Sequence, residues 1–435
     1  MAAPSVGPLW DVVEEHVDEA EFLFEQWQRA LSSPDHTLDQ LRLGWEARLL
    51  AHIEALIWNG SPAAQRLLVP ALADADISTA RAAVVALTRL STPGHDGYAE
   101  VWAALVGAAG AARHGLIRAL HIASDPAIDD GCRQALDGAG GREPLTALQV
   151  LAGRGTDPGG ALQVCLKSDD AGILAAALTA ARPAQDRRLL QPAIASALRS
   201  EVAAVRDAAL DTSVVWGLSD AWRLCRELAT TGHPEALLYL ALGGSGDDRD
   251  HDLVVRSIGD PRARAACLWA LGFSGRVSAV EDCLPLLGDA DDATARLAGE
   301  AMAAITGLPW RSQDALLRSP SDPGPEAGDD ADDADSDDSA LDSGPESALP
   351  LFDVTAVARW WQENRARFDP AVRYLNGAPL SPASLRGALR SQSMRRRRGL
   401  VIGVAIVTRG RWLPAPARLT TDQQRLDNQL THILG

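Results

Sequence analysis

The stretch DPRARAACLWALGFSG, from Asp260 to Gly275, decides the fold of this chain because its pattern recurs along the sequence. An acid and an arginine precede small apolar residues at helical spacing, and a glycine ends the run. A single copy would predict one capped core helix. Copies at a regular interval predict a structural repeat.

The pattern occurs eight times, at intervals of 29 to 33 residues. Its anchor positions are Arg81, Arg113, Glu143, Ile173, Arg206, Glu235, Arg264 and Arg296. Shorter apolar segments between the anchors complete a series of antiparallel helix pairs. One such pair cannot bury its apolar face alone, so neighbouring pairs must stack into a continuous core. The sequence therefore predicts an α-solenoid with about eight repeats.

Composition agrees with an all-α class, since alanine and leucine dominate the 435 residues and alternating β-branched residues are scarce. The five cysteines are scattered and never form a CxxC pair, which disfavours a disulfide framework or a zinc site. The N-terminal segment lacks the features of a signal peptide, and the longest apolar run is too short to cross a bilayer. We expect a soluble, cytoplasmic protein.

The net charge of −17 is distributed unevenly along the chain. Residues 319–349 carry eleven acids and no base, whereas the residues from 350 onward carry fourteen arginines and five acids. The acidic segment has little to bury, which predicts a disordered linker. The predicted domains are an N-terminal helical cap (1–60), the repeats (61–318), the linker (319–349) and a small basic, mainly helical domain (350–435).

The flanks of the repeats also have helical patterns. Residues 9–31 and 37–60 predict two long amphipathic helices, with Thr37 and Gln40 as a capping box for the second. A further helix pair is expected between residues 351 and 389, broken at DP and at NGAPLSP. Residues 399–408 are compatible with a helix or a strand.

The repeats resemble the HEAT class, and the flanks are similar to the proteobacterial TIGR02270 family of HEAT-repeat proteins. The resemblance rests on VVEEHVDEAEFLF, on AMAAITGLPW, and above all on WWQENRARFDPAVRYLNGAPLSPASLRGALR. It implies a helical-repeat protein of unassigned function, whose relatives tend to occur among genes of type VI secretion systems. The linker of this chain is unusually long and acidic for that family, and its segment after Arg398 is unusually rich in β-branched residues.

Two groups of residues are candidates for binding. Trp360, Trp361, Arg365 and Arg367 could form an aromatic and basic surface for a peptide. Adjacent residues on a helix point about 100° apart, so we expect one tryptophan in the core and the other exposed. The run Arg395, Arg396, Arg397 and Arg398 could bind nucleic acid or form an ion cluster, within the chain or with a partner protein. The negative charge of the repeats disfavours nucleic acid.

Acidic residues raise two further alternatives. An acid stands four or five positions before several anchors, at Asp76, Glu201, Asp260 and Asp292. These acids could be helix N-caps that also form ion pairs between repeats, or they could form a ladder of charges that binds a ligand. The cluster GDDRDHD, with Asp247, Asp248, Asp250, His251 and Asp252, lacks the spacing of a calcium loop. We interpret it as a solvated turn and expect no metal site.

No sequence motif for nucleophilic catalysis or for a cofactor is present. We therefore expect a non-catalytic scaffold or adaptor that binds another protein, with no cofactor and no small-molecule substrate. An enzyme on a HEAT-like scaffold, lyase-like or protein-modifying, is the first alternative. Nucleic-acid binding through the basic C-terminal domain is the second.

Overall fold

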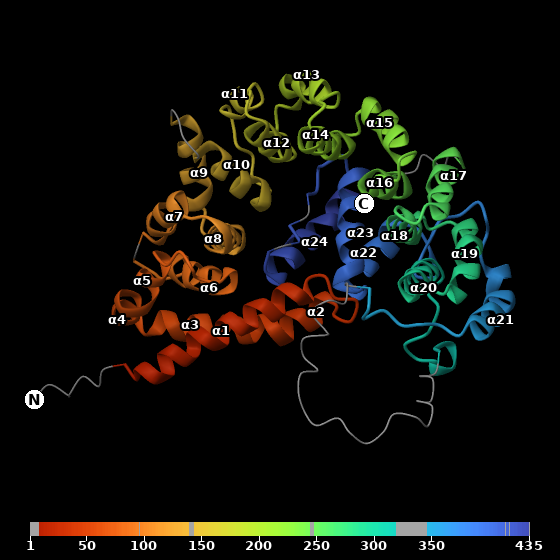
Figure 1. Ribbon diagram of the computed structural model, residues 1–435, viewed down its shortest axis with the longest axis horizontal. Helices are drawn as coiled ribbons and strands as arrows, with labels where there is room; N and C mark the ends of the chain where they lie inside the picture. Colours follow the sequence, from red (N-terminus) through yellow and green to blue (C-terminus); the bar gives the residue numbers. More distant parts are fainter. Residues whose placement is uncertain are drawn as a thin grey trace, which may run out of the picture. The chain divides into compact units, whose positions relative to one another are not determined.

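The computed structural model describes residues 8–94, 96–138, 143–243, 248–318, 346–413, 415–416 and 418–434. These residues form an all-α fold with a single two-stranded hairpin, which confirms the predicted class (Figure 1). The chain divides into two compact units, the first from residues 1–32, 36–221 and 404–435, the second from residues 33–35 and 222–403. These bounds differ from the four predicted domains, which stay a prediction. The predicted linker lies outside the described residues, except for 346–349.

The first unit is built from helices at both ends of the sequence. Its helices are α1 (Trp10–Ala30), α2 (Leu38–Leu41), the π-helix η1 (Arg42–Glu46), α3 (Ala47–Trp58), α4 (Gly60–Ala63), the π-helix η2 (Ala64–Leu68), α5 (Val69–Leu72), α6 (Thr79–Leu90), α7 (Gly97–Gly107), α8 (Gly110–Ile122), α9 (Ala127–Asp137), α10 (Glu143–Arg154), α11 (Leu162–Cys165), α12 (Ala171–Ala180), α13 (Arg187–Ala197), α14 (Ala203–Trp216) and α24 (Thr420–Leu434). Two further helices, α15 (Ser219–Ala229) and α23 (Met394–Val407), contribute residues to both units.

The second unit contains the remaining helices and the hairpin. Its elements are α16 (Pro234–Gly243), α17 (Asp248–Arg256), the 3-10 helix η3 (Ser257–Gly259), α18 (Arg264–Ser274), α19 (Val277–Cys283), the 3-10 helix η4 (Leu284–Gly288), α20 (Asp292–Thr306), the 3-10 helix η5 (Asp314–Leu316), α21 (Val354–Asn364), the 3-10 helix η6 (Arg365–Arg367), β1 (Tyr374–Leu375), β2 (Ala378–Pro379) and α22 (Pro382–Ser391). The undecided residues 399–408 are helical up to Val407, within α23.

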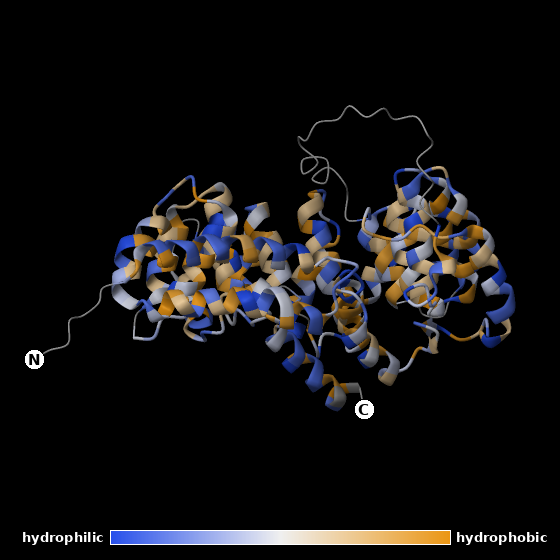
Figure 2. Cartoon of the chain, turned by 90° about the horizontal axis from the view of Figure 1, so that it is seen from below, coloured by the Kyte–Doolittle hydropathy of each residue, from blue (hydrophilic) through white to orange (hydrophobic). Residues whose placement is uncertain are grey.

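Alternate helices contact one another in both units. In the first unit, α6 packs on α8, α8 on α10, α10 on α12 and α12 on α14. In the second unit, α16 packs on α18 and α18 on α20. Every predicted anchor lies within the first five residues of one of these eight helices. Hydrophobic and hydrophilic residues share each helix, as an amphipathic packing requires (Figure 2).

The five anchor arginines have different partners. Arg81 pairs with Asp18 and Glu21 on α1, whereas Arg113 donates to Thr146 and Gln149 on α10. Arg264 donates to the carbonyl of Ile258, and Arg296 to that of Leu349. Arg206 lies near Asp207 of its own helix, with the guanidinium and carboxylate 3.5 Å apart.

None of the four acids proposed as caps occupies the N-cap position. The N-cap residues are Ser78 for α6, Val202 for α14, Ala263 for α18 and Asp291 for α20. Asp291 and Ser78 lie one and two positions away from Asp292 and Asp76, and their side chains accept from main-chain N–H groups. The cap is therefore set by which residue leaves the helical backbone conformation, and charge spacing alone does not identify it.

Residues near the C-terminus pack against the first unit at three places. Arg187 on α13 donates to the carbonyls of Arg409 and Gly410, at 2.6 and 3.1 Å. Arg418 donates to the carbonyl of His121 at the end of α8, and Thr420 begins α24 beside Glu46. The C-terminal residues thus belong to the same compact unit as α1.

Candidate functional site

The aromatic residues of α21 and the basic residues of η6 show where a surface is available. Trp361 is buried, and its indole N–H donates to Glu281 at 3.0 Å. Trp361 is therefore the expected core tryptophan and does not contribute to a binding surface. Trp360, one position earlier, is half-buried and not fully exposed as expected. Arg365 is exposed and pairs with Glu281 at 2.9 Å, and Arg367 is exposed beside Asn364. Trp360, Arg365 and Arg367 form what we call the α21 patch.

The arginine run has two environments. Arg395, Arg396 and Arg397 are buried, whereas Arg398 is exposed. Arg395 pairs with Glu300 and Glu346, at 3.2 and 3.3 Å. The structure therefore places three of the four guanidinium groups inside the fold, where neither a phosphate backbone nor a partner protein reaches them.

Arg396 lies between α23 and α18. It donates to the carbonyl of Gly272 at 2.7 Å, and its guanidinium lies over the rings of Trp269 and Phe273. Burial lowers the pKa of Arg396 to about 10. The aromatic faces and the carbonyl offset part of the free-energy cost of burying this charge, and the contacts join α23 to α18.

Sequence reasoning missed the hairpin that joins three helix ends. Arg373 donates to carbonyls of Ala241, Phe273 and Ser274, at the C-terminal ends of α16 and α18. Asn376 and Gly377 form the hairpin turn and donate to carbonyls near the end of α20, at 2.7 and 2.9 Å. Both turn residues have positive φ, which the dipeptide Asn-Gly favours. That dipeptide was the available signal for a hairpin.

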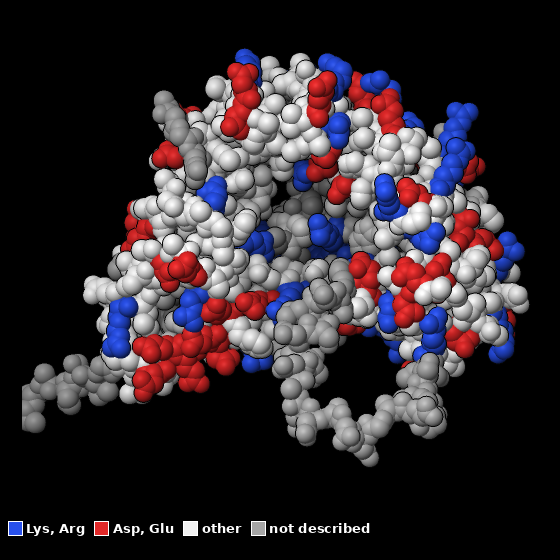
Figure 3. Space-filling model, viewed as in Figure 1, with Lys and Arg blue, Asp and Glu red and all other residues white. Residues whose placement is uncertain are grey.

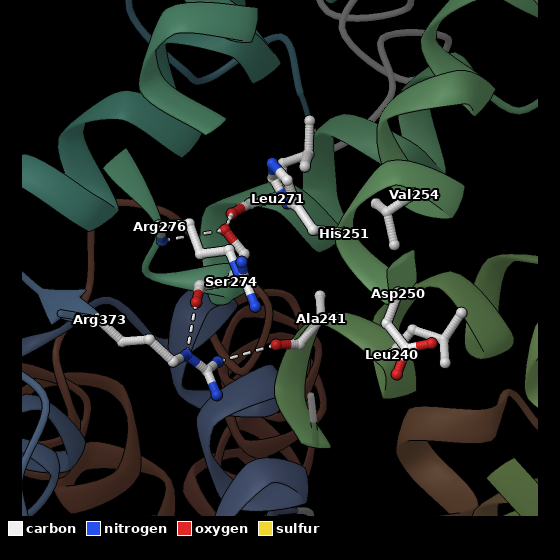
Figure 4. A pocket seen from close by; sticks show the side chains of 9 residues that line it. All are labelled: Leu240, Ala241, Asp250, His251, Val254, Leu271, Ser274, Arg276 and Arg373. Atoms are coloured by element: carbon white, nitrogen blue, oxygen red, sulfur yellow. Dashed lines mark hydrogen bonds between the residues drawn. The ribbon is translucent and has the colours of Figure 1, made fainter. Parts of the chain in front are cut away.

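A small polar cavity lies beside Arg373 (Figure 4). Asp250 from α17 lines it and accepts two hydrogen bonds from Arg226, at 2.6 and 3.0 Å. His251 also lines it, and its Nε2 lies 2.8 Å from Ser278 Oγ. The cavity volume of about 10 Å³ is the space of one water molecule, so it is too small for a substrate.

The acidic cluster does not form the solvated turn that the sequence predicted. Asp248, Asp250, His251 and Asp252 lie on helix α17, not in a solvated turn, while Asp247 lies outside the described residues. Arg226 and Arg276 neutralise Asp250 and Asp248. In the part of the chain that the structure describes, no three His, Cys, Asp or Glu residues are grouped to hold a metal ion.

All five cysteines are buried, and none of them forms a disulfide bond. Burial raises the pKa of Cys132 and of Cys267 to about 12. At neutral pH these two thiols stay protonated, and the thiolate is the reactive nucleophile. They behave as small core residues.

Two further observations bear on partners. Acidic side chains gather along α1 (Figure 3). Among the described residues, no helix is long and apolar enough to cross a membrane.

Comparisons with known proteins give no family. No family model matches the chain, and no curated protein does. Among solved structures, the X-ray structure of the YibA protein of Escherichia coli covers 69% of this chain and 99% of its own, at 12% identity and a TM-score of 0.28.

Proposed function

We propose that this protein is a non-catalytic scaffold or adaptor that binds another protein. In this proposal the helices form HEAT-like repeats of an α-solenoid, with residues 1–60 as cap, 319–349 as disordered linker and 350–435 as a basic domain. One observation carries it: the eight anchors, spaced by 29 to 33 residues, each lie within the first five residues of a helix. Six contacts join successive members of this series within the two units. Such arrays offer extended surfaces to protein partners.

The described polar groups support a binding role over a catalytic one. The guanidinium groups of Arg373 and Arg396 bond to main-chain carbonyls, and the cavity beside Arg373 has room for one water molecule. The α21 patch, by contrast, presents an aromatic side chain and two exposed arginines. Arginine and tryptophan are enriched where proteins bind one another.

The resemblance to the TIGR02270 family supports a partner from a type VI secretion system or one of its effectors. Cysteines without disulfide bonds support a reducing compartment, which we propose is the cytoplasm.

The test is affinity purification of the tagged, full-length protein from the cells that make it, followed by mass spectrometry of proteins and small molecules. The double variant Arg365→Glu/Arg367→Glu reverses two charges of the α21 patch. Arg262→Glu, at an exposed arginine in the same unit, is the matched control. We expect one protein in stoichiometric amount with the wild type and the control, and its loss with the double variant.

Other results would contradict the proposal. A partner retained by the double variant would remove the α21 patch from the binding surface. A stoichiometric metal, pigment or cofactor with no protein partner would replace the adaptor with an enzyme.

A further inference from the structure

The first unit contains an apolar cavity that the proposed scaffold role does not use. Its volume is about 120 Å³. Phe24 and Trp27 of α1 form one wall, and both are fully buried. Leu49 and Ile53 of α3 and Leu87 of α6 form others. Four of these five side chains have no polar atoms. The fifth, Trp27, donates its indole N–H to Glu46 at 3.0 Å.

The cavity has an opening with a different composition. Leu50 is 38% exposed, and Ser91 and Ser124 are exposed. These three residues also line the cavity, so it communicates with solvent on their side. A ligand can therefore enter without unfolding the unit.

The volume and the apolar walls of the cavity define which chemical group fits inside it. Water gains few hydrogen bonds among such walls, and an engineered apolar cavity of about 150 Å³ stays dry and binds benzene. A cavity of about 120 Å³ accommodates one small ring or one branched aliphatic chain.

Two arginines are close neighbours of residues that line the cavity. Ile122, at the end of α8, lines it, and Arg118 stands one helical turn earlier on the same face. Among the described residues, Arg118 has no hydrogen-bond or ion-pair partner. Burial lowers the pKa of the Arg118 guanidinium, so this charge is partly desolvated.

A second guanidinium lies on the same side. Leu419 lines the cavity, and its neighbour Arg418 donates through Nε to the carbonyl of His121 at 3.4 Å. Asp129 and Asp422 act on Arg418 electrostatically. Burial lowers the pKa of His121 to about 4, so its ring is neutral at pH 7 and does not bind an anion as a cation would.

We propose that this cavity binds a small monocarboxylic acid with one aromatic ring or a branched aliphatic chain. The apolar group occupies the cavity, and the carboxylate pairs with Arg118, with Arg418 as a second contact. Charge-assisted bonds between a carboxylate and a guanidinium are strong where water is scarce. Because Leu419 belongs to the C-terminal residues, the bound acid also holds those residues against α1 and α3.

The experiment is isothermal titration calorimetry of the full-length protein at pH 7 with phenylacetate, and with toluene as the neutral probe. We expect phenylacetate to bind more tightly than toluene. Arg118→Gln should weaken phenylacetate at least about tenfold and leave toluene unchanged, since a tenfold loss is about 1.4 kcal/mol, within the range for a charged hydrogen bond. Leu50→Trp should close the opening and remove both ligands.

Matched variants separate these effects from misfolding. Arg188→Gln and Leu189→Trp make the same changes at exposed residues of α13 that do not line the cavity. Both should bind phenylacetate like the wild type, and all variants should keep the wild-type circular dichroism spectrum. Failure of phenylacetate to bind the wild type would overturn the proposal. Equal binding of toluene, or an unchanged affinity in Arg118→Gln, would overturn the assignment of an acid.

Discussion

At the scale of single residues, neighbours in the arginine run differ because the helix turns each side chain toward different surroundings. Arg396 is 4% exposed and packs on Trp269 and Phe273, whereas Arg398 is exposed. We expect Arg396→Ala to lower the free energy of unfolding by about 2–4 kcal/mol, because it leaves a cavity and an unpaired carbonyl. Arg398→Ala should change it by less than about 0.5 kcal/mol. Urea unfolding followed by circular dichroism measures both, and equal effects would contradict the burial argument.

Gly153 illustrates a close approach that only glycine permits. A Cβ atom at this position of α10 would overlap the ring of His121, whose Nε2 lies 3.1 Å from the carbonyl of Gln149. Gly153→Ala should therefore destabilise the protein by about 1–3 kcal/mol through overpacking. Gly387 in α22 has open space around the same position, so Gly387→Ala should stabilise by about 0.5–1 kcal/mol. Thermal unfolding of both variants measures the two effects. A melting temperature that shifts in the same direction for both would contradict the prediction.

At the scale of elements, one buried carboxylate fixes the start of α24. Glu46, in the π-helix η1, accepts from Trp27 and from the main-chain N–H and hydroxyl of Thr420, at 2.7 to 3.0 Å. A carboxylate at a helix N-terminus satisfies N–H groups that have no partner within the helix. Burial nevertheless raises the pKa of Glu46 above its ordinary value of 4.5.

This raised pKa makes a prediction with a definite sign. The folded protein binds the Glu46 proton more tightly than the unfolded chain does, so this group's contribution to stability falls as pH rises from 4.5 through the raised pKa. Glu46→Gln removes that dependence. We expect the stability of the wild type, relative to Glu46→Gln, to decrease as pH rises over this window in urea titrations. A relative increase would mean that the hydrogen bonds outweigh burial.

The hairpin is the second element with a decisive role. The main-chain N–H groups of Asn376 and Gly377 donate to carbonyls of α20. The side chain of Arg373 donates to carbonyls at the ends of α16 and α18. The stretch with the most specific family resemblance thus closes helix ends, a structural role that accounts for its arginine and its Asn-Gly pair.

At the scale of the whole molecule, the first unit depends on residues from both ends of the sequence. A chain that stops after Thr408 would lack Arg418, Leu419 and Thr420, and so the contacts to His121 and Glu46. We expect faster amide hydrogen exchange at η1 and at the end of α8, because those contacts restrain local opening. Exchange at α18 and α20 in the second unit should be unchanged. Uniform acceleration in both units would contradict the assignment of residues 409–434 to the first unit alone.

The sequence by itself determined the helical class, the positions of the eight anchored helices and local features such as the capping box of Thr37 and Gln40. These depend on residues within a few turns of each other, where spacing is a direct guide to structure. Only the tertiary structure decided that Arg396 is buried while Arg398 is exposed and that Glu46 contacts Thr420. It also decided that Leu419 and residues of α1 and α3 line one apolar cavity. Each of these brings together side chains far apart in sequence, and burial depends on that packing and not on residue type.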